Sequence, residues 1–221
     1  MSLPLLIFDL DGTLIDSAPD IAVALNKTLT HFGKPNVPYE VVVAHIGDGL
    51  RKLLADFFPE FQNSPSSEYK HVEDHFLKTY EEEMYHTTQP FPGVLDFLRA
   101  YEGPLGIVTN KNEDPARKIV RHLGLDKIPW IGVFGADTFS EKKPHPLPLL
   151  EMMKRADRDA SNTIMIGDGA PDMKAAQAAG VRSIAVRFGY TQMPILQSYG
   201  PAGILEDYAG LQNLVLGLIN R

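Results

Sequence analysis

Two aspartates near the start of the chain are the first residues whose types and spacing suggest chemistry. Asp9 and Asp11 come directly after the short apolar run 5–8, and Gly12 follows them. Side chains two positions apart at the end of a strand can point into one crevice, and a glycine there allows a sharp turn. Two neighbouring carboxylates can divide two tasks, one as nucleophile or metal ligand and the other as acid and base.

A plainer interpretation of the same segment is a solvated turn or a calcium-binding loop. Asp-x-Asp-x-Thr resembles the start of such a loop, but the further oxygen ligands at alternate positions and the later Glu are absent. The full run DLDGT after an apolar strand is also much more specific than a pair of aspartates. The segment therefore favours a reactive site over a calcium loop.

The segment GIVTNKNED places Thr109 and Asn110 directly after the apolar run 105–108. A threonine hydroxyl at a strand end, together with nearby backbone N–H groups, can hold a phosphoryl oxygen. Taken alone, the segment is better explained by a β-forming threonine and an asparagine in a turn. Its chemical role depends on whether the other polar clusters lie beside it.

The run EKKPHP supplies a lysine, Lys143, immediately before Pro144. A residue before proline is extended and lies outside a helix, so Lys143 can reach into a crevice. Its compact ammonium would neutralise charge on a phosphoryl group beside Asp9. An exposed basic turn is the plainer interpretation of this run, and we expect Lys142 to be an ordinary residue of that kind.

The run MIGDGAPDMKAA carries two more carboxylates. Asp168 ends a predicted strand and can complete a magnesium site with Asp9, because magnesium prefers oxygen ligands from a few carboxylates, water and substrate phosphate. Asp172 lies near the N-terminus of the next predicted helix, where an anion is favoured. It is either a simple N-cap or a residue that supports and orients a metal ligand.

Short unbroken apolar runs predict the strands that position these clusters. Unbroken runs, rather than alternating ones, are typical of strands covered on both faces of a parallel sheet. Helical segments lie between most of them, which indicates a doubly wound α/β fold whose ligands bind beyond the carboxyl ends of the strands. The four clusters should therefore converge. The predicted strands are 5–8, 105–108, 131–134, 163–166 and 183–186, and the predicted helices begin at Asp114, near Pro146 and near Asp172.

Between the first two strands lies a long segment, 16–89, with helical rather than strand periodicity. It is too long for a loop, so we predict a separate all-helical domain there and a core domain of residues 1–15 and 90–221. The expected helices run from a capping box at Ser17–Asp20 to Gly33, from Pro38 through a break at Gly47 and Gly49 to Phe58, and onward from Ser64-Pro65.

Composition limits the classes of protein and partner. The 221 residues carry a formal net charge of -7, which would attract neither nucleic acid nor an anionic membrane surface. The absence of cysteine excludes disulfides, thiolate metal sites and cysteine nucleophiles. The apolar start is too short for a signal segment or a membrane span. We expect a cytoplasmic protein without nucleic-acid or membrane partners, either a monomer or a homodimer.

The four clusters, in this order and after these strands, resemble the four motifs of the haloacid dehalogenase-like superfamily of phosphatases. DLDGT together with KKPHP and GDGAPD is a highly specific combination. The resemblance covers essentially the whole chain, which implies a Rossmann-like core, and residues 16–89 stand in the position of that family's helical cap domain. Within the superfamily, the run FDLDGTLIDSAPDIAVALN and the KPHP motif are most similar to phosphoglycolate phosphatases.

The resemblance implies a role for each matching carboxylate. Asp9 is the nucleophile and a magnesium ligand. Asp11 protonates the leaving group, then activates water, and contributes its backbone carbonyl to the metal. Asp168 is the remaining carboxylate ligand of Mg²⁺, and Asp172 supports it. The fourth motif reads Gly-Asp-Gly where Gly-Asp-Ser or Gly-Asp-Thr is also common, a departure that removes a hydroxyl but no implied ligand.

The resemblance further implies that Thr109, Asn110 and Lys143 bind the phosphoryl group. A small phosphorylated metabolite such as phosphoglycolate would then be hydrolysed through an aspartyl-phosphate. The helix break before Arg51 presents this residue to the crevice, where its guanidinium can pair with a small carboxylate on the substrate. A solvated arginine on a helix surface explains the same pattern equally well.

Rival functions remain open at this point. A phosphomutase of the same fold, similar to β-phosphoglucomutase, would share every motif and differ only in its cap and its product. A dehalogenase is disfavoured by Asp11, because a halide leaving group needs no acid. A non-catalytic binding protein is disfavoured by the complete set of acid, base, lysine and metal ligands. A zinc site at the helical pair His71 and His75 lacks an evident third ligand.

Overall fold

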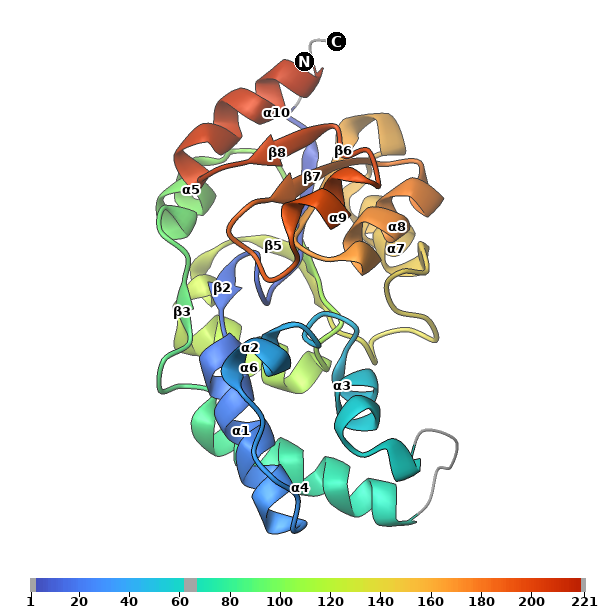
Figure 1. Cartoon of the computed structure of the whole chain (residues 1–221). Helices are drawn as coiled ribbons and strands as arrows, with labels where there is room; N and C mark the ends of the chain where they lie inside the picture. The colour runs from blue at the N-terminus through green and yellow to red at the C-terminus, as the bar shows by residue number, and fades with distance from the viewer. Residues whose placement is uncertain (1–2, 62–66, 220–221) are drawn as a thin grey trace.

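The computed structural model describes residues 3–61 and 67–219 (Figure 1). Within this part of the chain, six strands pair in parallel in the order β5-β4-β1-β6-β7-β8. The first strand is therefore central, and the chain winds outward from it on both sides. The strands are β1 Leu5–Phe8, β4 Leu105–Val108, β5 Trp130–Phe134, β6 Thr163–Gly167, β7 Arg182–Val186 and β8 Gly203–Leu205.

Helices cover both faces of this sheet. Alternate residues of β1 enter different apolar clusters, Leu6 and Phe8 with α5, α6 and α10 on one side, and Leu5 and Ile7 with α7 and α8 on the other. A strand buried on both faces needs an unbroken apolar run, so the predicted doubly wound α/β fold is confirmed. The helices are α5 Val94–Ala100, α6 Glu113–His122, α7 Leu147–Ala156, α8 Ala170–Ala179, α9 Met193–Gln197 and α10 Leu211–Ile219, with short 3₁₀ turns at Leu125–Lys127, Ala160–Asn162 and Tyr208–Gly210.

Several element boundaries differ from the sequence prediction. The helix expected to begin at Asp114 begins at Glu113 with Asn112 as its N-cap, and the helix expected near Asp172 begins at Ala170. The edge strand β8 was not predicted, because three residues that include a glycine give no clear apolar run. These shifts of a few residues leave the order of the elements unchanged.

Residues 17–88 form mostly helices, which lie together in the lower half of Figure 1. The chain leaves the core through β2 (Ile15–Asp16) and returns through β3 (Gln89–Pro90), and these two strands pair antiparallel. We propose that the helices between them form the cap domain, 16–89. They are α1 Ala18–His31, α2 Tyr39–Val43, α3 Leu50–Phe57 and α4 Ser67–Glu83, with a 3₁₀ turn at Pro59–Phe61. The expected helix start at Ser64-Pro65 lies outside the described residues.

The predicted capping box at the start of α1 is wrong. Ser17 is the N-cap, but its N–H donates to the Tyr190 hydroxyl (2.9 Å) rather than to Asp20. The Asp20 carboxylate instead accepts the N–H groups of Thr87 (3.0 Å) and Thr88 (2.9 Å), on the chain returning to the core. Tertiary partners have replaced the local ones, so the start of α1 is tied to both the core and the return linker.

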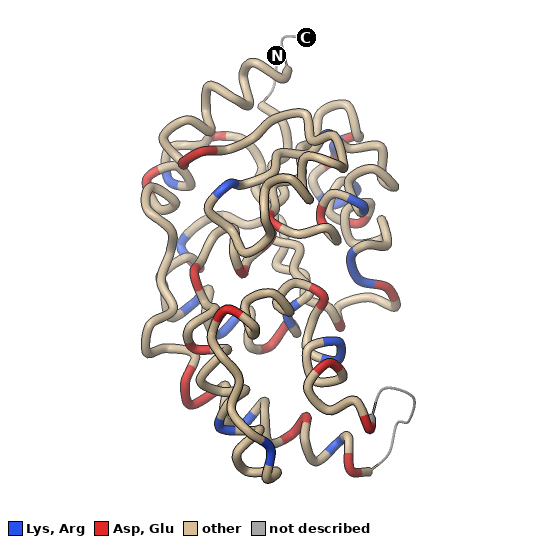
Figure 2. The backbone as a smooth tube through the Cα atoms, in the orientation of Figure 1, with Lys and Arg blue, Asp and Glu red and all other residues tan. Residues whose placement is uncertain are grey.

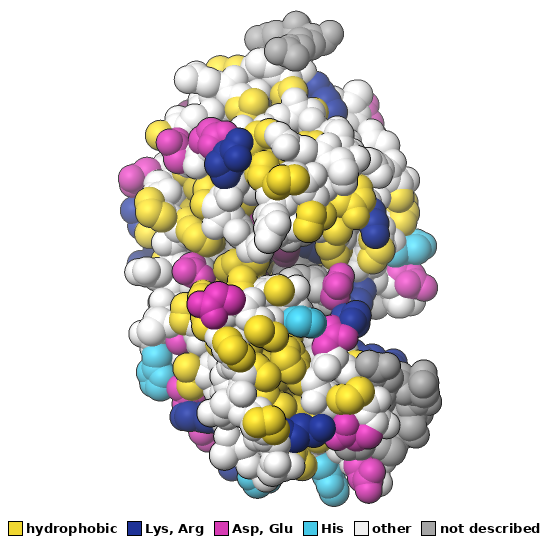
Figure 3. All heavy atoms as spheres, viewed as in Figure 1, with side chains coloured by type: hydrophobic (Ala, Val, Ile, Leu, Met, Phe, Trp, Pro, Cys, Tyr) yellow, Lys and Arg dark blue, Asp and Glu magenta, His cyan; other side chains and the backbone are white. Residues whose placement is uncertain are grey.

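Basic and acidic residues are interspersed along the chain (Figure 2). Hydrophobic side chains gather over α1 and α2 (Figure 3), where Val23, Tyr39 and Val41 are exposed. Of the helices in the described ranges, none has the length and apolar character needed to cross a membrane.

Candidate active site

The polar clusters that follow β1, β4 and β6 lie at one edge of the sheet. These strands are parallel neighbours, so their carboxyl ends coincide. Asp9 extends β1 by donating its N–H to the Ile166 carbonyl (2.9 Å), and Thr109 extends β4 by donating to the Phe134 carbonyl (2.9 Å). Main-chain pairing therefore fixes both residues at the edge where ligands of such folds bind.

Three carboxylates are clustered at this edge. One oxygen each of Asp9, Asp168 and Asp172 lies within 4.8 Å of the others, and all three side chains are buried. Asp168 accepts one hydrogen bond from the Thr13 hydroxyl (3.1 Å) and another from the Tyr190 N–H (2.8 Å). The fold thus brings Asp168 to Asp9, as a shared metal site requires.

Lys143 is the cation of this cluster. Its side chain is 1% exposed, and its Nζ lies 2.9 Å from Asp9 Oδ1 and 2.6 Å from Asp172 Oδ1. It stands between β5 and α7, and its peptide bond to Pro144 is cis. Contact with Asp9 places an ammonium where a phosphoryl group attached to that carboxylate would carry negative charge.

The cluster holds more negative than positive charge. Burial raises the pKa of Asp9 from its ordinary value of 3.8 to about 7, and Asp172 adds to the shift while Lys143 opposes it. Burial and the charge of Asp9 likewise raise the pKa of Asp168. Buried carboxylates that hold protons this firmly need more positive charge around them, and oxygen donors are the ligands that Mg²⁺ prefers. The residues present therefore fit a divalent cation.

Two glycines let the chain pass directly against Asp168. Gly12 has a φ of +77°, and a Cβ there would overlap the Asp168 carboxylate. A Cβ on Gly189 would overlap the same side chain and would lie 2.7 Å from the Gly12 carbonyl oxygen. A side chain at either position would displace Asp168 from the cluster, so the absence of a Cβ at both is part of the site.

Asp172 is not the N-cap of its helix, because Gly169 holds that position. It is the third residue of α8, and its Oδ2 accepts the N–H of the N-cap residue Gly169 (2.9 Å). Its other oxygen, Oδ1, accepts from Lys143 Nζ. One carboxylate thus caps the first turn of the helix and also holds Lys143 beside Asp9.

The Asp11 carboxylate has a separate set of partners. Lys111 Nζ lies 3.0 Å from each of its two oxygens, and the Ser17 hydroxyl donates to Oδ1. Sequence reasoning did not single out Lys111. The available signal was its place two residues after Thr109, since residues just beyond a strand end reach the same edge of the sheet.

Lys111 also links the core to the cap. Its side chain is 8% exposed, and its Nζ lies 4.6 Å from the centre of the Tyr80 ring, which α4 contributes. Burial opposes the charged form of Lys111, but the attraction of Asp11 outweighs it and raises the pKa of the ammonium. Burial also raises the pKa of Tyr80 to about 12. The pair is therefore a cation against a neutral phenol at neutral pH.

The side chain of Asn110 ties the same two regions together. Its amide donates to the carbonyl oxygens of Gly47 in the cap (3.1 Å) and Lys143 in the core (3.0 Å). Both amide hydrogens are therefore engaged by the protein itself. The phosphate-binding role of Asn110 stays a prediction, and only the main-chain N–H of this residue could serve it. Thr109 is buried, and its hydroxyl accepts the Lys111 N–H (3.1 Å).

A cavity of about 70 Å³ lies between the sheet edge and the cap. Asp9 and Asp11 line it from the core, together with Thr109 and Lys111, while the cap contributes mostly apolar walls. The carboxylates of Asp9 and Asp11 thus face a small space with a mostly apolar lining on the cap side. The cap residues that line it are Ile21, His45, Ile46, Gly47, Gly49, Leu50, Leu53, Phe76, Leu77 and Tyr80.

The structure does not bring Arg51 to this cavity. Arg51 is exposed on α3, whereas its helix neighbours Leu50 and Leu53 are the residues of that helix that line the space. Only one face of an amphipathic helix can meet the core, and here the apolar face does so. The expected pairing of Arg51 with a substrate carboxylate is therefore not supported by its position.

Residues 6–186 match the family model described as haloacid dehalogenase-like hydrolase. The chain belongs to this family. Curated relatives named phosphoglycolate phosphatase include one from Neisseria gonorrhoeae, 37% identical over 86% of this chain and 82% of the relative, and one from Agrobacterium fabrum, 34% identical over 94% and 90%. The resemblance inferred from the motifs is thereby confirmed.

A solved structure agrees with this assignment. The crystal structure of a protein from Haemophilus somnus, described as a predicted phosphoglycolate phosphatase, superposes with a TM-score of 0.88 at 26% identity. It covers 97% of this chain and 98% of its own. The match extends over the hydrolase core and the helical insert alike.

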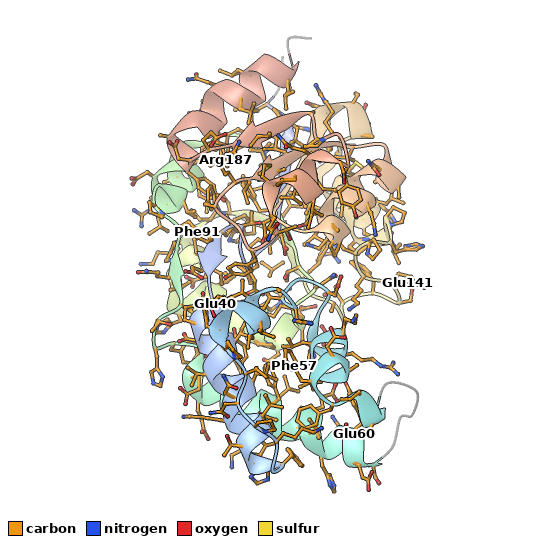
Figure 4. The ribbon with its side chains drawn as sticks, viewed as in Figure 1. Glu40, Phe57, Glu60, Phe91, Glu141 and Arg187 are labelled. Atoms are coloured by element: carbon orange, nitrogen blue, oxygen red, sulfur yellow. The ribbon has the colours of Figure 1, made fainter. Side chains whose placement is uncertain are left out.

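The cap of this hydrolase is tied to the core beside the cavity. Lys142 Nζ donates to the Asp48 carbonyl (2.5 Å), so Lys142 is a half-buried cap contact rather than the exposed turn residue that we expected. A Cβ on Gly49 would lie 2.7 Å from that Nζ and 2.8 Å from the Asn110 carbonyl oxygen. The turn that carries Lys142 begins near Glu141, at the right of Figure 4.

Proposed function

We propose that this hydrolase is a Mg²⁺-dependent phosphatase that acts on a small anionic phosphate monoester such as phosphoglycolate, with Asp9 as nucleophile. One observation carries the proposal: among the three clustered carboxylates, Asp9 is the one that lines the cavity, and Lys143 contacts it from within the core. The names of the curated relatives support the same substrate class.

The first step is a displacement at phosphorus by the Asp9 carboxylate. An Asp9 oxygen bonds to phosphorus as the bond to the ester oxygen breaks, giving an aspartyl-phosphate and an alcohol. Lys143 contacts Asp9 and Thr109 lines the same cavity, and both stabilise the charge on the equatorial phosphoryl oxygens. Water then attacks the aspartyl-phosphate, which releases phosphate and restores Asp9.

Asp11 serves as acid in the first step and as base in the second. It lines the cavity next to Asp9, within reach of a leaving oxygen. It gives a proton to that oxygen and later takes one from the attacking water. The Ser17 hydroxyl and Lys111 hold the carboxylate in place from the side of the cap.

Asp9 and Asp168 are the side chains that would hold the metal, together with the backbone carbonyl of Asp11. Asp172 lies in the same cluster, but both of its oxygens are engaged, by Lys143 and by the Gly169 N–H, so we assign it the supporting role. When bound, Mg²⁺ neutralises the carboxylates and polarises the phosphoryl group. The cluster of three buried carboxylates supports this assignment of a metal ion.

The size and lining of the cavity favour a small substrate. The cavity is small, about 70 Å³, so a hexose or a nucleoside would require more displacement of the cap than a short acid. The walls from the cap are apolar and offer few partners for the hydroxyls of a sugar. We therefore prefer a short acid such as phosphoglycolate to the substrates of a phosphomutase.

The test is a panel of phosphate monoesters assayed with purified protein and Mg²⁺. We expect kcat/KM to be highest for phosphoglycolate, lower for glucose phosphates and lowest for nucleoside monophosphates, with phosphate released in stoichiometric amounts. EDTA should abolish turnover, and added Mg²⁺ should restore it. Conversion of a hexose phosphate to its isomer, or full activity in chelator, would contradict the proposal.

The cellular setting follows from composition alone. We propose a cytoplasmic enzyme without nucleic-acid or membrane partners, because the chain is acidic and contains no cysteine. It would act as a monomer or a homodimer. Size-exclusion chromatography with light scattering decides between the two.

A further inference from the structure

Lys111 is the sole lysine or arginine among the described residues that line the cavity. The two carboxylates on the same wall, Asp9 and Asp11, would repel any second negative group on a substrate. An acidic substrate can bind there only if a cation meets its acid group. Lys111 stands at the place where such a cation is needed.

The ammonium of Lys111 has capacity for another acceptor. A lysine ammonium carries three N–H donors, and Lys111 directs Nζ at two oxygens of Asp11, each 3.0 Å away. One donor remains for a ligand or for the nearby Tyr80 hydroxyl. Because Asp11 protonates the leaving oxygen in the proposed mechanism, that ligand lies close to the leaving group.

Tyr80 supplies an independent observation from the cap side. Tyr80 is 3% exposed, and its buried hydroxyl has no well-formed hydrogen bond among the described residues, although Lys111 lies close enough to lower its pKa. Leaving a buried hydroxyl unpaired is costly, and nearly all such groups in folded proteins have a partner. Tyr80 lines the cavity beside Lys111, so a ligand oxygen there would satisfy it.

The surroundings strengthen a charge interaction at this point. Leu50, Leu53 and Phe76 form an apolar part of the cavity wall. Opposite charges attract more strongly where water is excluded than at an exposed surface. A carboxylate held by Lys111 would therefore be bound firmly. An uncharged group at the same place would leave the charge of Lys111 without a substrate partner.

We propose that Lys111, assisted by the Tyr80 hydroxyl, binds the carboxylate of the substrate and so selects an acidic phosphate ester. The inference rests on the proposed phosphatase function and replaces Arg51 as the recognising cation. In phosphoglycolate, a single methylene joins the carboxylate to the ester oxygen, so a carboxylate on Lys111 places that oxygen beside Asp11. Selection and protonation then use adjacent groups.

The test compares phosphoglycolate with its amide, which has the same size but no negative charge at that end. Wild-type protein should prefer the acid, and Lys111→Met should reduce the ratio of the two kcat/KM values by roughly 100-fold. Lys111→Arg, which keeps the charge, should retain most of the preference. Tyr80→Phe should lower the ratio by roughly ten-fold.

Lys118→Met is the matched control. Lys118 lies on α6, just after the loop that carries Lys111, and also pairs with a cap residue, Glu81 (2.5 Å), but it does not line the cavity. The substitution Lys118→Met therefore removes a positive charge and a contact between cap and core without changing a residue that lines the cavity. Its ratio of acid to amide hydrolysis should equal that of the wild type.

The outcomes separate this inference from the proposed function. Equal losses for acid and amide in Lys111→Met would mean that Lys111 only orients Asp11, and would overturn the inference alone. An amide hydrolysed as well as the acid by wild type would overturn the inference and leave a phosphatase of another substrate class. Absence of hydrolysis of either ester with Mg²⁺ would overturn the proposed function itself.

Calorimetric binding of acid and amide to Asp9→Asn measures recognition without turnover. The acid should bind more tightly, and adding Lys111→Met to that variant should remove the difference. Equal affinities for acid and amide in Asp9→Asn would overturn the inference whatever the activity. Should Lys111→Met fail to fold, the same comparison with Tyr80→Phe decides, and an unchanged affinity ratio there overturns the role of the phenol.

Discussion

Two buried lysines, each against an aspartate, mark two different regions of this molecule. Lys143 lies among three carboxylates, and all of its partners belong to the core. Lys111 lies between Asp11 of the core and Tyr80 of the cap. The same residue type at similar burial thus lies inside the carboxylate cluster in one place and lines the cavity under the cap in the other.

The two regions also differ in how completely their polar atoms are paired. In the carboxylate cluster each aspartate has protein donors, whereas two of the three unpaired buried polar atoms in the described ranges, Tyr80 Oη and Asn110 Oδ1, lie where cap and core meet. A fully paired cluster is rigid before substrate arrives, and an unpaired boundary is completed by a ligand. We infer that the core positions the catalytic groups before substrate binds, while substrate selection depends on groups at the boundary with the cap.

The strongest test of this division is Asp9→Asn. Removing the nucleophile should lower kcat by at least about 10⁴-fold, because loss of a covalent catalyst removes the pathway itself. The amide has the same shape and relieves crowding among buried carboxylates, so circular dichroism and thermal unfolding should stay those of a folded protein. Substantial residual turnover by a folded variant would refute the covalent mechanism.

Asp168→Ala should affect the metal rather than the substrate. We expect the Mg²⁺ concentration for half-maximal activity to rise by more than about 100-fold. Replacing a residue that only supports a metal ligand can already lower metal affinity by about that much. The acid-to-amide preference should be unchanged, because Lys111 and Tyr80 are untouched. Activity titrations against Mg²⁺ measure the first effect, and an unaltered Mg²⁺ requirement would remove Asp168 from the assigned ligands.

Gly49→Ala examines the boundary without touching a catalytic group. The new Cβ meets Lys142 Nζ at 2.7 Å and the Asn110 carbonyl at 2.8 Å, so the cap loop has to lift from the core. We expect KM for phosphoglycolate to rise by about ten-fold with little change in kcat, as the pocket loses its fit. Gly33→Ala is the matched control, since Gly33 has a similar positive φ (+72°) but nothing within 4 Å.

The pH dependence of stability tests the charge balance of the core cluster. Because the pKa of Asp9 is raised from 3.8 to about 7, the metal-free folded state binds more protons than the unfolded state between these values. The stabilisation that protonated Asp9 gives the folded state is complete below about pH 4 and is lost as pH rises through 7. Mg²⁺ replaces the missing protons, so the rise in Tm on adding Mg²⁺ should be larger at pH 8 than at pH 5.

The difference should be at least about 2 to 4 °C, the shift expected for 1 kcal/mol in a chain of this size. Differential scanning fluorimetry with and without EDTA measures it. Asp168→Ala serves as the control, in which the dependence on Mg²⁺ should shrink at both pH values. An equal rise in Tm at the two pH values in the wild type would show that the cluster is not short of positive charge.

Arg51→Ala is expected to have the smallest effect. Arg51 is exposed and does not line the cavity, so the preference for phosphoglycolate over glucose phosphate should stay within about two-fold of wild type. The measurement is the ratio of kcat/KM values for the two esters. A clear loss of preference would mean that α3 rotates on substrate binding and brings the guanidinium inward, contrary to the role assigned to Lys111.

The sequence predicted the core region far better than the boundary. Asp9, Thr109 and Asp168 each follow an unbroken apolar strand, and the parallel sheet places all three at one edge whatever the side chains around them. Local pattern therefore determines which residues lie there. Their catalytic and metal-binding roles remain predictions that the variants above examine.

The boundary depends on contacts that no local pattern encodes. Tyr80 and Lys111 belong to different domains of the proposed division, and their approach depends on how α4 packs over the sheet edge. Ser17 and Asp20 had the pattern of a capping box, yet Ser17 donates its N–H to Tyr190 and Asp20 accepts from Thr87 of the return linker. Propensity and spacing describe neighbours along the chain, and tertiary packing decided these contacts.

The paired linkers have a consequence for how such an enzyme can change. Ile15 is opposite Pro90 and Asp16 is opposite Gln89, and residues directly opposed in an antiparallel pair lie about 5 Å apart. Beside them Phe91, labelled in Figure 4, contacts Phe188 with ring centres 4.8 Å apart and the two rings tilted by 52°. Viewed from the sheet, the whole helical insert is a single loop whose two ends already meet.

A tight hairpin turn, or a different insert of any length, could bridge the same two positions without moving a strand. The core would keep its nucleophile and metal ligands while exchanging the walls of its pocket. In this architecture a lineage, or a designer, can acquire a new specificity by replacing one segment between two fixed anchor points.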